Sequence, residues 1–283
     1  MKVIQSPANL KATVGALKKR GKRVGFVPTM GFLHEGHLSL VRESKKENPV
    51  TVVSIFVNPL QFGPREDLRN YPRDLVKDTS LLTKEKVDIL FAPSVKDFYP
   101  EGFQTAVTVK ELSRPLCGVS RPTHFTGVAT VVLKLLNLVG PDVLYLGQKD
   151  FQQCRVLERM IEDLAVPVKV RRIRTKREPD GLAMSSRNTL LSSEERTQAL
   201  VLRQALQSAE DRVRAGVREG KMIKQAMLRI LGSASGGFTD YAEIVDAKSL
   251  GPVVKLKKGD RILAAVAVYF NNTRLIDNIL IKV

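Results

Sequence analysis

The sequence has few cysteines, few histidines and no tryptophan. Its two cysteines are Cys117 and Cys154, and neither belongs to a C-x-x-C pair or lies beside a histidine pair. Two isolated thiols form neither the disulfide framework of a small secreted domain nor a zinc site. They indicate a reducing compartment, and we therefore expect a cytoplasmic protein.

The sequence also lacks a long hydrophobic run. Its longest strongly apolar stretch extends from Ile262 to Phe270, far below the roughly 20 residues that a membrane-spanning helix needs. The N-terminal residues have neither the apolar core nor the small-residue cleavage site of a signal peptide. We therefore expect no membrane partner.

Acidic residues are scarce relative to basic ones, 29 against 46, which gives a formal net charge of +17. Such a charge attracts anions, whether nucleic acid, an acidic membrane or a phosphorylated small molecule. Six of the cations lie between Lys169 and Arg177. A nucleic-acid-binding protein is therefore one hypothesis, but an aromatic content of 6% offers few stacking platforms. We expect no nucleic-acid partner.

Strand and helix patterns alternate over residues 1–175. The stretch 50–57 is nearly all apolar and β-branched, which is typical of a strand buried on both faces. Alternation of such strands with helices of ten or more residues predicts an α/β fold, a Rossmann-like, doubly wound parallel sheet. The predicted strands are 23–28, 50–57, 87–92, 143–146 and 168–173, and the predicted helices are 6–20, 34–46, 74–86, 126–139 and 150–163.

The composition changes near Lys176. A helix is predicted to start at Ser192 and a second to end near Leu231, followed by short strands at 241–245, 261–269 and 274–281. We therefore expect two domains, residues 1–175 and a smaller C-terminal α+β domain, residues 176–283, that combines helices with a sheet.

Ligands of doubly wound sheets bind at the carboxyl ends of the strands. This rule selects the loops after Val27, Phe56 and Leu146. The first of them contains two of the three histidines in the chain, His34 and His37. Three positions apart at a helix start, they share one face, where backbone N–H groups and the helix dipole attract anions. A zinc pair would need i,i+4 spacing or further ligands, and the sequence shows none.

The string P-T-M-G-F-L-H-E-G-H, from Pro28 to His37, resembles the HxGH signature of the class I nucleotidyltransferase superfamily. In its longer form it resembles the pantothenate synthetase family in particular. Further segments resemble that family in the same order along the chain, so that the resemblance extends from about residue 24 to 278. They are F-V-N-P-L-Q-F at 56–62, R-P-T-H-F-T-G-V at 121–128, G-Q-K-D-F-Q-Q at 147–153 and D-G-L-A-M-S-S-R-N at 180–188.

The resemblance implies an ATP-dependent condensation of (R)-pantoate with β-alanine to pantothenate, a step of coenzyme A biosynthesis. Pantoate would first become pantoyl adenylate with release of pyrophosphate, and AMP would leave in the second step. The resemblance further implies Mg²⁺ as cofactor, a homodimer, a first domain that binds nucleotide and pantoate, and a second domain that acts as a lid. Another small-molecule adenylyltransferase of the same superfamily is the alternative function.

The resemblance also implies roles for individual residues. For catalysis these are His34, His37 and Lys149. For ATP binding they are Met30, Gly31, His34, Gly36, His37, Gly147, Gln148, Lys149, Asp150, Lys176, Met184, Ser185, Ser186 and Arg187. For substrate binding they are Asn58, Gln61, His124 and Gln153, and for the metal Asp78.

These residue types suit the implied chemistry. A carboxylate that attacks a triphosphate meets like charge, and imidazole, ammonium, guanidinium and hydroxyl donors offset the charge that builds up at phosphorus. Gln61 and Gln153 are neutral and both donate and accept, which suits the hydroxyls and carboxylate of a small polyol acid. A phosphorylated acceptor would call for extra Arg or Lys there. For His124, capping of the helix nearby is an equal interpretation.

Overall fold

The computed structural model describes residues 1–63, 68 and 71–283. The chain divides into two compact units. Unit 1 comprises Met1–Arg114, Arg121–Gln148 and Gln153–Arg174, and unit 2 comprises Pro115–Ser120, Lys149–Gln152 and Thr175–Val283.

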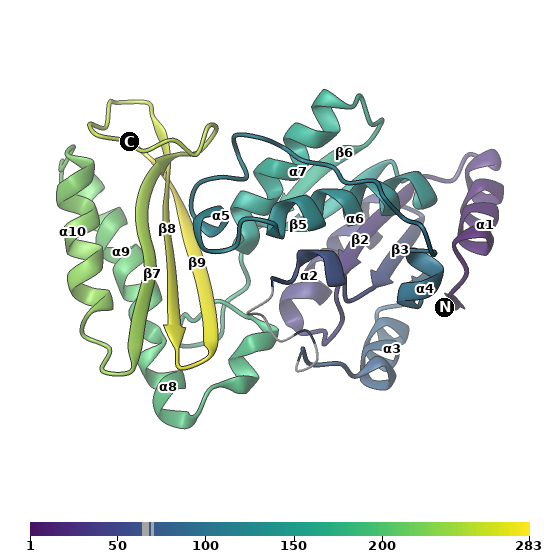
Figure 1. Cartoon of the computed structure of the whole chain (residues 1–283), viewed down its shortest axis with the longest axis horizontal. Coiled ribbons are helices and arrows are strands. Elements are labelled where there is room, and N and C mark those ends of the chain that lie inside the picture. Colours follow the sequence, from purple (N-terminus) through teal and green to yellow (C-terminus); the bar gives the residue numbers. More distant parts are fainter. Residues whose placement is uncertain (64–67, 69–70) are drawn as a thin grey trace. The chain divides into compact units, whose positions relative to one another are not determined.

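Unit 1 contains a six-stranded, fully parallel sheet, which confirms the predicted α/β class (Figure 1). The strand order is β1-β4-β3-β2-β5-β6. The chain passes from β2 to β3 and β4 on one side and reaches β5 and β6 on the other, so the topological switch lies at β2 and β5. The strands are β1 (Lys2–Ile4), β2 (Val24–Thr29), β3 (Val50–Ile55), β4 (Ile89–Phe91), β5 (Val143–Gly147) and β6 (Lys169–Ile173).

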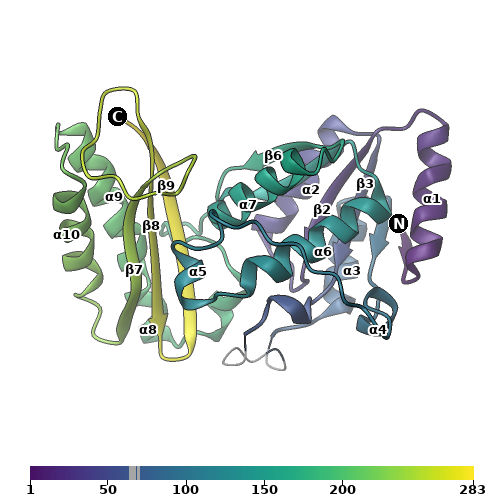
Figure 2. The same cartoon turned by 45° about the horizontal axis from the view of Figure 1, so that its top comes forward.

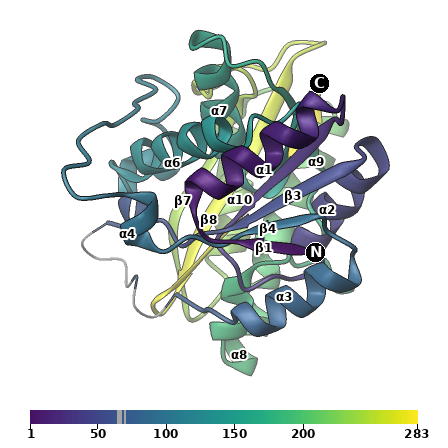
Figure 3. The ribbon, with the colours of Figure 1, turned by 90° about the vertical axis from the view of Figure 1, so that its right-hand side faces the viewer.

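Helices cover both faces of this sheet (Figure 3). One face carries α1 (Pro7–Lys19), α6 (His124–Val139) and α7 (Phe151–Asp163), and the other carries α2 (Glu35–Glu47) and α3 (Leu75–Lys84). The shorter elements are η1 (Pro59–Gln61), α4 (Val95–Phe98) and η2 (Gln148–Asp150), of which Lys149 and Asp150 belong to unit 2. Ser6 caps α1 as predicted, because its Oγ accepts the N–H of Asn9 at 3.4 Å.

The central strands are buried on both faces because helices lie above and below them. Val27 on β2, Val53 on β3 and Leu90 on β4 are fully buried in one apolar cluster. Strand β1 was not predicted, since its three residues are too few to show a periodic pattern. Among the described residues, no helix is long and apolar enough to cross a membrane.

Unit 2 contains an antiparallel sheet of β7 (Gly237–Asp246), β8 (Arg261–Phe270) and β9 (Thr273–Lys282). Helices α9 (Leu200–Arg214) and α10 (Gly220–Leu231) lie along it, as Figure 2 shows. Leu206, Met227 and Val266 meet in the core between these helices and the sheet. The predicted combination of helices with a small sheet is therefore confirmed.

Residues 192–231 form three helices where two were predicted. The additional helix is α8 (Ser193–Gln198), which begins with a capping box between Ser192 and Glu195. Ala199 ends α8 and starts α9, and no residue type in the sequence marks that break. Gly216, at φ 91°, then separates α9 from α10. Unit 2 also includes the short elements α5 (Cys117–Ser120) and η3 (Ser186–Leu190).

Gly25 on β2 is a site where side-chain volume is excluded. A Cβ there would lie 2.2 Å from Ser44 Oγ and 2.6 Å from Asn48 Nδ2. We expect Gly25→Ala to lower the free energy of unfolding by about 1–3 kcal/mol. Gly15→Ala in α1 is the matched control, because no atom lies within 4 Å of its added Cβ and alanine gains up to about 1 kcal/mol in a helix. Equal urea-denaturation midpoints for the two variants would contradict this packing.

Candidate active site

The loop after β2 makes a tight turn that only glycine accommodates. Gly31 has φ 84°, and a Cβ there would lie 3.0 Å from both Asp78 Oδ2 and Ile55 Cγ2. The Gly31 N–H donates to Thr29 Oγ1 at 3.2 Å, and Thr29 Oγ1 donates to the main-chain oxygen of Ser54 at 2.7 Å. The loop is thus attached to both β2 and β3.

Asp78 on α3 fixes the next part of this loop. Its Oδ2 accepts the Phe32 N–H at 2.8 Å, and its Oδ1 accepts the Leu33 N–H at 2.7 Å. The residue is buried, and this burial raises the pKa of Asp78, although the two backbone donors act in the opposite direction. A carboxylate in this position stabilises the left-handed conformation of Phe32, at φ 52°.

The role of Asp78 as a metal ligand stays a prediction. Both carboxylate oxygens face backbone N–H groups of the loop. Across residues 1–63, 68 and 71–283, no group of three or more His, Cys, Asp or Glu could hold a metal ion. Asp78 is therefore a structural anchor of the loop that carries the histidines.

His34 and His37 form the start of α2. His34 is the N-cap, its Nδ1 accepts the Gly36 N–H at 3.1 Å, and His37 Nδ1 accepts the His34 N–H at 3.4 Å. The two ring centroids are 4.1 Å apart. Because each Nδ1 accepts a backbone proton, the neutral rings carry their own proton on Nε2. The cap therefore selects the tautomer that carries its proton on Nε2. This nitrogen is then a hydrogen-bond donor, as an anionic ligand requires.

Asn58 is held by four hydrogen bonds within unit 1. Its Nδ2 donates to Gln61 Oε1 and to the main-chain oxygen of Gly127, both at 3.0 Å. Its Oδ1 accepts the Leu60 N–H at 3.3 Å and the Tyr99 hydroxyl at 3.0 Å. An amide has two protons to donate and two lone pairs to accept with, so all four positions are used. Asn58 thus holds its neighbours in position, and its direct contact with substrate stays a prediction.

Gln61 has a defined amide orientation as a consequence. Its Oε1 accepts from Asn58, and its Nε2 lies 3.1 Å from Met30 Sδ, to which it donates. This contact joins the loop after β3 to the loop that carries the histidines. Gln61 thus keeps its carbonyl oxygen on Asn58 and turns its NH₂ group towards Met30.

His124 supports the same loop from α6. Its Nδ1 donates to the main-chain oxygen of Gln61 at 3.0 Å, and Arg121 Nη2 donates to that oxygen at 3.3 Å. Gly127 permits the close approach, because a Cβ there would lie 2.2 Å from the main-chain oxygen of Leu60. The two roles considered for His124, substrate contact and helix capping, stay predictions.

The third predicted loop follows β5. Gly147 ends this strand, Gln148 follows it, and Cys154 Sγ donates to the Gly147 oxygen at 3.4 Å. Gln153 is half-buried in the first turn of α7. Because β5 pairs with β2 in parallel, both strands end at the same edge of the sheet. Unit 1 therefore brings the predicted residues of three loops to that edge, namely Met30, Gly31, His34, Gly36, His37, Asn58, Gln61, His124, Gly147, Gln148 and Gln153.

Unit 2 holds the remaining predicted residues in a second cluster. Lys149 Nζ lies 3.8 Å from Asp150 Oδ1, and the main-chain oxygen of Lys149 accepts from Asn278 Nδ2 at 2.7 Å. The N–H of Asn278 donates to Asp277 Oδ1 at 2.8 Å. Arg177 pairs with the buried Asp277 through two hydrogen bonds, at 2.6 and 3.1 Å. Strand β9 therefore anchors Lys149.

The segment from Lys176 to Arg187 belongs to this second cluster. The Met184 N–H donates to the Lys176 oxygen at 3.0 Å, which returns the chain in a hairpin. Ser185 caps η3, since its Oγ accepts the Arg187 N–H at 3.2 Å. Ser186 is buried, whereas Lys176 is exposed.

The supporting role of Tyr99, Arg177, Asp277 and Asn278 was not predicted from the sequence. Asp277 is an acid almost fully buried in a strand, but its partner lies far away in the sequence. No local pattern indicates such a pair.

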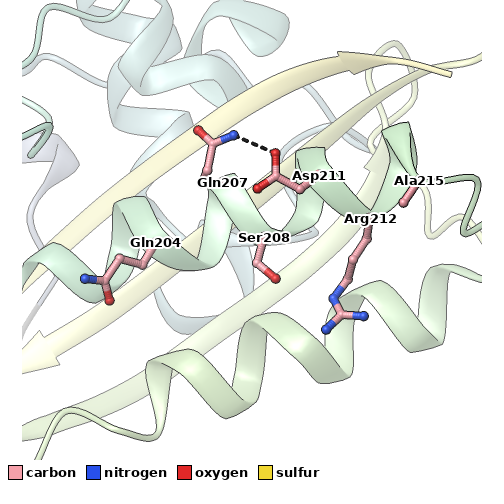
Figure 4. Close-up of a pocket in the computed structure, with 6 residues that line it drawn as sticks. All are labelled: Gln204, Gln207, Ser208, Asp211, Arg212 and Ala215. Atoms are coloured by element: carbon pink, nitrogen blue, oxygen red, sulfur yellow. Dashed lines mark hydrogen bonds between the residues drawn. The ribbon is translucent and has the colours of Figure 1, made fainter.

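A hollow of about 510 Å³ lies on unit 2 along α9 (Figure 4). Gln207 Nε2 donates to Asp211 Oδ1 there, at 2.9 Å. No residue predicted for the site lines this hollow, so it has no part in the candidate site. Its lining residues are Gln204, Gln207, Ser208, Asp211, Arg212 and Ala215.

Comparisons with known proteins agree with this arrangement. The family model for pantoate–β-alanine ligase matches residues 2–280. The chain belongs to the pantoate–β-alanine ligase family. It is 55% identical over 280 residues to the pantothenate synthetase of Sulfurihydrogenibium sp. (strain YO3AOP1), with 99% of each chain covered. It is 52% identical over 278 residues to that of Thermotoga petrophila, with 98% of this chain and 99% of the relative covered.

Solved structures of pantoate–β-alanine ligases have the same fold. The crystal structure of the Thermus thermophilus pantothenate synthetase is 45% identical, with 99% of each chain covered and a TM-score of 0.93. The Francisella tularensis pantoate–β-alanine ligase, complexed with βγ-ATP and β-alanine, is 36% identical, with 99% of this chain and 97% of that chain covered and a TM-score of 0.81. The chain is thus an enzyme of the ligase class.

The anchoring role of Asp78 is testable by substitution with an uncharged isostere. In Asp78→Asn one backbone N–H would face an NH₂ group, so we expect the free energy of unfolding at neutral pH to fall by about 1–3 kcal/mol. Asp74→Asn, at the N-cap of the same helix, is the matched control, since Asn caps as well as Asp. Guanidinium denaturation measures both, and equal losses would contradict the anchor.

The raised pKa of Asp78 gives a second, pH-dependent expectation. A carboxyl whose pKa is raised on folding contributes stability that is fully present below its unfolded pKa of about 3.9 and is lost as the pH rises through its folded pKa. The stability difference between wild type and Asp78→Asn therefore grows as the pH falls towards about 3.9. A difference that shrinks on acidification would show that the two N–H donors outweigh burial.

Proposed function

We propose that the chain uses ATP to activate pantoate and then joins the pantoyl group to β-alanine. The observation that supports this most directly is the pair of imidazoles at the start of α2, whose Nδ1 atoms accept backbone protons and whose neutral rings therefore donate at Nε2. Gln61, which contacts Met30 in the same loop, provides the adjacent neutral amide. The family and the nucleotide and β-alanine in the Francisella tularensis ligase support the choice of substrates.

In the first step a pantoate carboxylate oxygen attacks the α-phosphorus of ATP. A new oxygen–phosphorus bond forms, the bond from the α-phosphorus to the bridging oxygen breaks, and pyrophosphate leaves with that electron pair. Negative charge builds up on the phosphoryl oxygens during the attack. The Nε2–H groups of His34 and His37 and the positive end of α2 offset this charge at fixed positions. Gly31 and Gly36 let the backbone approach the nucleotide closely.

The cationic and hydroxyl donors of unit 2 are assigned to ATP on the family resemblance. Lys149 is anchored through its main-chain oxygen by Asn278, and Ser185 caps the turn that carries Arg187. Guanidinium and ammonium groups stabilise a transferring phosphoryl group as fixed charges. The same resemblance assigns Gly147, Gln148, Asp150, Lys176, Met184 and Ser186 to nucleotide contacts.

Gln61 and Gln153 are assigned to pantoate. The Gln61 amide turns its NH₂ group away from Asn58, so it offers a proton to a hydroxyl or carboxylate oxygen. In the second step the β-alanine amine attacks the acyl carbon of pantoyl adenylate, an amide bond forms, and AMP leaves with the electrons of the anhydride bond. The amine loses a proton to solvent water in this step.

Mg²⁺ is proposed to arrive with the triphosphate, because the described residues form no group of three or more His, Cys, Asp or Glu that could hold it. Asp78 uses both of its oxygens for the loop, and the part of the chain that the structure describes offers no cluster of metal-binding side chains. A triphosphate with water satisfies the octahedral preference of Mg²⁺ without a protein cage. Four further proposals rest on the resemblance. Residues 1–175 bind nucleotide and pantoate, residues 176–283 act as a lid, the protein is a homodimer, and it is located in the cytoplasm.

The two alternative functions have less support. The loop at 58–61 presents neutral amides, whereas an acceptor with its own phosphate would favour cations. Binding of nucleic acid was suggested by the cations between Lys169 and Arg177, but three of them are engaged in ion pairs. These pairs are Arg171–Glu47, Arg172–Glu158 and Arg177–Asp277.

Isotope exchange tests the adenylate step. Labelled pyrophosphate should enter ATP in the presence of pantoate and without β-alanine, since the first step is reversible. Omission of pantoate should abolish the exchange. Correctly folded protein that catalyses no pantoate-dependent exchange would rule out pantoyl adenylate as intermediate.

Two substitutions at His37 separate its cap role from its donor role. Asn in His37→Asn retains an acceptor for the His34 N–H but lacks a donor at the Nε2 position, whereas Ala in His37→Ala lacks both. Because removal of one such donor costs about 10²-fold in rate, we expect both variants to lose exchange activity by that factor or more. Lys46→Ala, an exposed change on the same helix, is the control and should retain full activity. Normal exchange in His37→Asn would remove the imidazole from the mechanism.

A further inference from the structure

A series of side-chain contacts leads from Lys134 through aromatic rings and Asn58 to Gln61. Of its members, Lys134 and the aromatic residues were not predicted for the site. It begins with Lys134 on α6, whose Nζ lies 4.8 Å from the ring centroid of Phe103, 5.3 Å from that of Phe98 and 5.6 Å from that of Tyr99. An ammonium group surrounded by three aromatic rings is attracted to their π faces. All four residues belong to unit 1, so the cluster is one packed group.

Tyr99 is held by this group on several sides. Its ring centroid lies 4.9 Å from that of Phe98, 4.8 Å from that of Phe103 and 5.8 Å from that of Phe56. Burial raises the pKa of Tyr99, so its hydroxyl keeps its proton at neutral pH. A ring confined in this way delivers the hydroxyl to one place, 3.0 Å from Asn58 Oδ1.

The Tyr99 hydroxyl helps to fix which way the Asn58 amide faces. With the observed orientation, Oδ1 meets two donors, Tyr99 and the Leu60 N–H, and Nδ2 meets two acceptors, Gln61 Oε1 and the Gly127 oxygen. A rotated amide would set its oxygen against the Gly127 oxygen and its NH₂ group against the Leu60 N–H. Such a buried mismatch costs the desolvation of both groups.

The orientation of Asn58 in turn decides that of Gln61. Because Asn58 offers an N–H, Gln61 must present Oε1 to it, and its NH₂ group then faces Met30. If Asn58 were turned, Gln61 would turn as well and would present an oxygen in place of a donor. An acid substrate, which offers lone pairs, needs the donor.

We propose that Tyr99 is a positioning residue for the acid substrate, and that it acts through Asn58 to keep the donor side of the Gln61 amide towards pantoate. Lys134 and the neighbouring rings hold Tyr99 in place for this task. The inference rests on the proposed role of Gln61 in binding pantoate, and it adds a determinant of specificity outside the residues that touch substrate.

Tyr99→Phe is the direct test, because it removes one oxygen and keeps the ring that Lys134 covers. We expect the KM for pantoate to rise about tenfold, the equivalent of about 1.4 kcal/mol. The KM values for ATP and β-alanine should stay within about twofold of wild type, which corresponds to a change in binding free energy of less than RT. Steady-state kinetics with each of the three substrates varied in turn measures this.

Tyr145→Phe is the matched control. Tyr145 is also a tyrosine of unit 1, fully buried where Tyr99 is half-buried, and its hydroxyl also bonds a buried asparagine, Asn48, at 2.8 Å. It should lose stability as Tyr99→Phe does, with an unchanged KM for pantoate. If the pantoate KM rises in both variants, the effect of Tyr99→Phe comes from a general loss of stability, and the proposal is overturned.

A double-mutant cycle tests whether Tyr99 acts through Gln61. In a Gln61→Ala background, Tyr99→Phe should have no further effect on the KM for pantoate, because the amide that it orients is absent. Additive effects would overturn the proposed route through Asn58. The exchange assay on the wild type separates this outcome from a failure of the proposed function. If the wild type catalyses pantoate-dependent pyrophosphate exchange, additive effects contradict only the role of Tyr99. If it does not, the proposed function is wrong.

Discussion

Buried polar groups must find partners, and in unit 1 this requirement determines where the functional side chains lie. Three polypeptide loops leave the carboxyl edge of a parallel sheet, and each would expose backbone N–H groups or amides without support. Asp78 takes two N–H groups of the first loop, and Asn58 takes four partners around the second. The loops that carry the residues assigned to catalysis and binding are therefore held in place by hydrogen bonds to Asp78 and Asn58.

This support has an electrostatic cost and an electrostatic use. Burial raises the pKa of Asp78, and the two hydrogen bonds from backbone N–H groups act in the opposite direction and offset part of the desolvation cost. The same bonds orient the loop so that α2 begins at His34, where the helix dipole is positive. Asp78 thus helps to form an anion-binding position at the start of α2 by holding the backbone of the loop. It does so without touching the anion, which a carboxylate in direct contact would repel.

The sequence was sufficient to predict what local pattern and motif determine. Alternating strands and helices predicted the parallel sheet, and the string around His34 and His37 indicated the family and its loop. Contacts between distant positions were beyond reach, since Asp78 lies 45 residues from Leu33 and Tyr99 lies 41 residues from Asn58. The hydrogen bonds of Asn58 and Asp78 could not be predicted, because a motif shows that a residue matters without showing which atoms it uses. The break at Ala199 was missed for a related reason, since alanine is the best helix former.

The positive charge of the chain and the neutrality of Gln61 have complementary effects. A net charge of +17 attracts every anion in solution by a long-range field, so it favours encounter with ATP and with an acid substrate but distinguishes poorly among anions. Discrimination must then come from short-range groups whose donors and acceptors are fixed. An amide offers both, and it is selective only if it cannot turn round. A neutral amide in a strongly cationic protein therefore depends on its hydrogen-bonded support more than a lysine or arginine in the same position would, because those side chains present donors in every orientation.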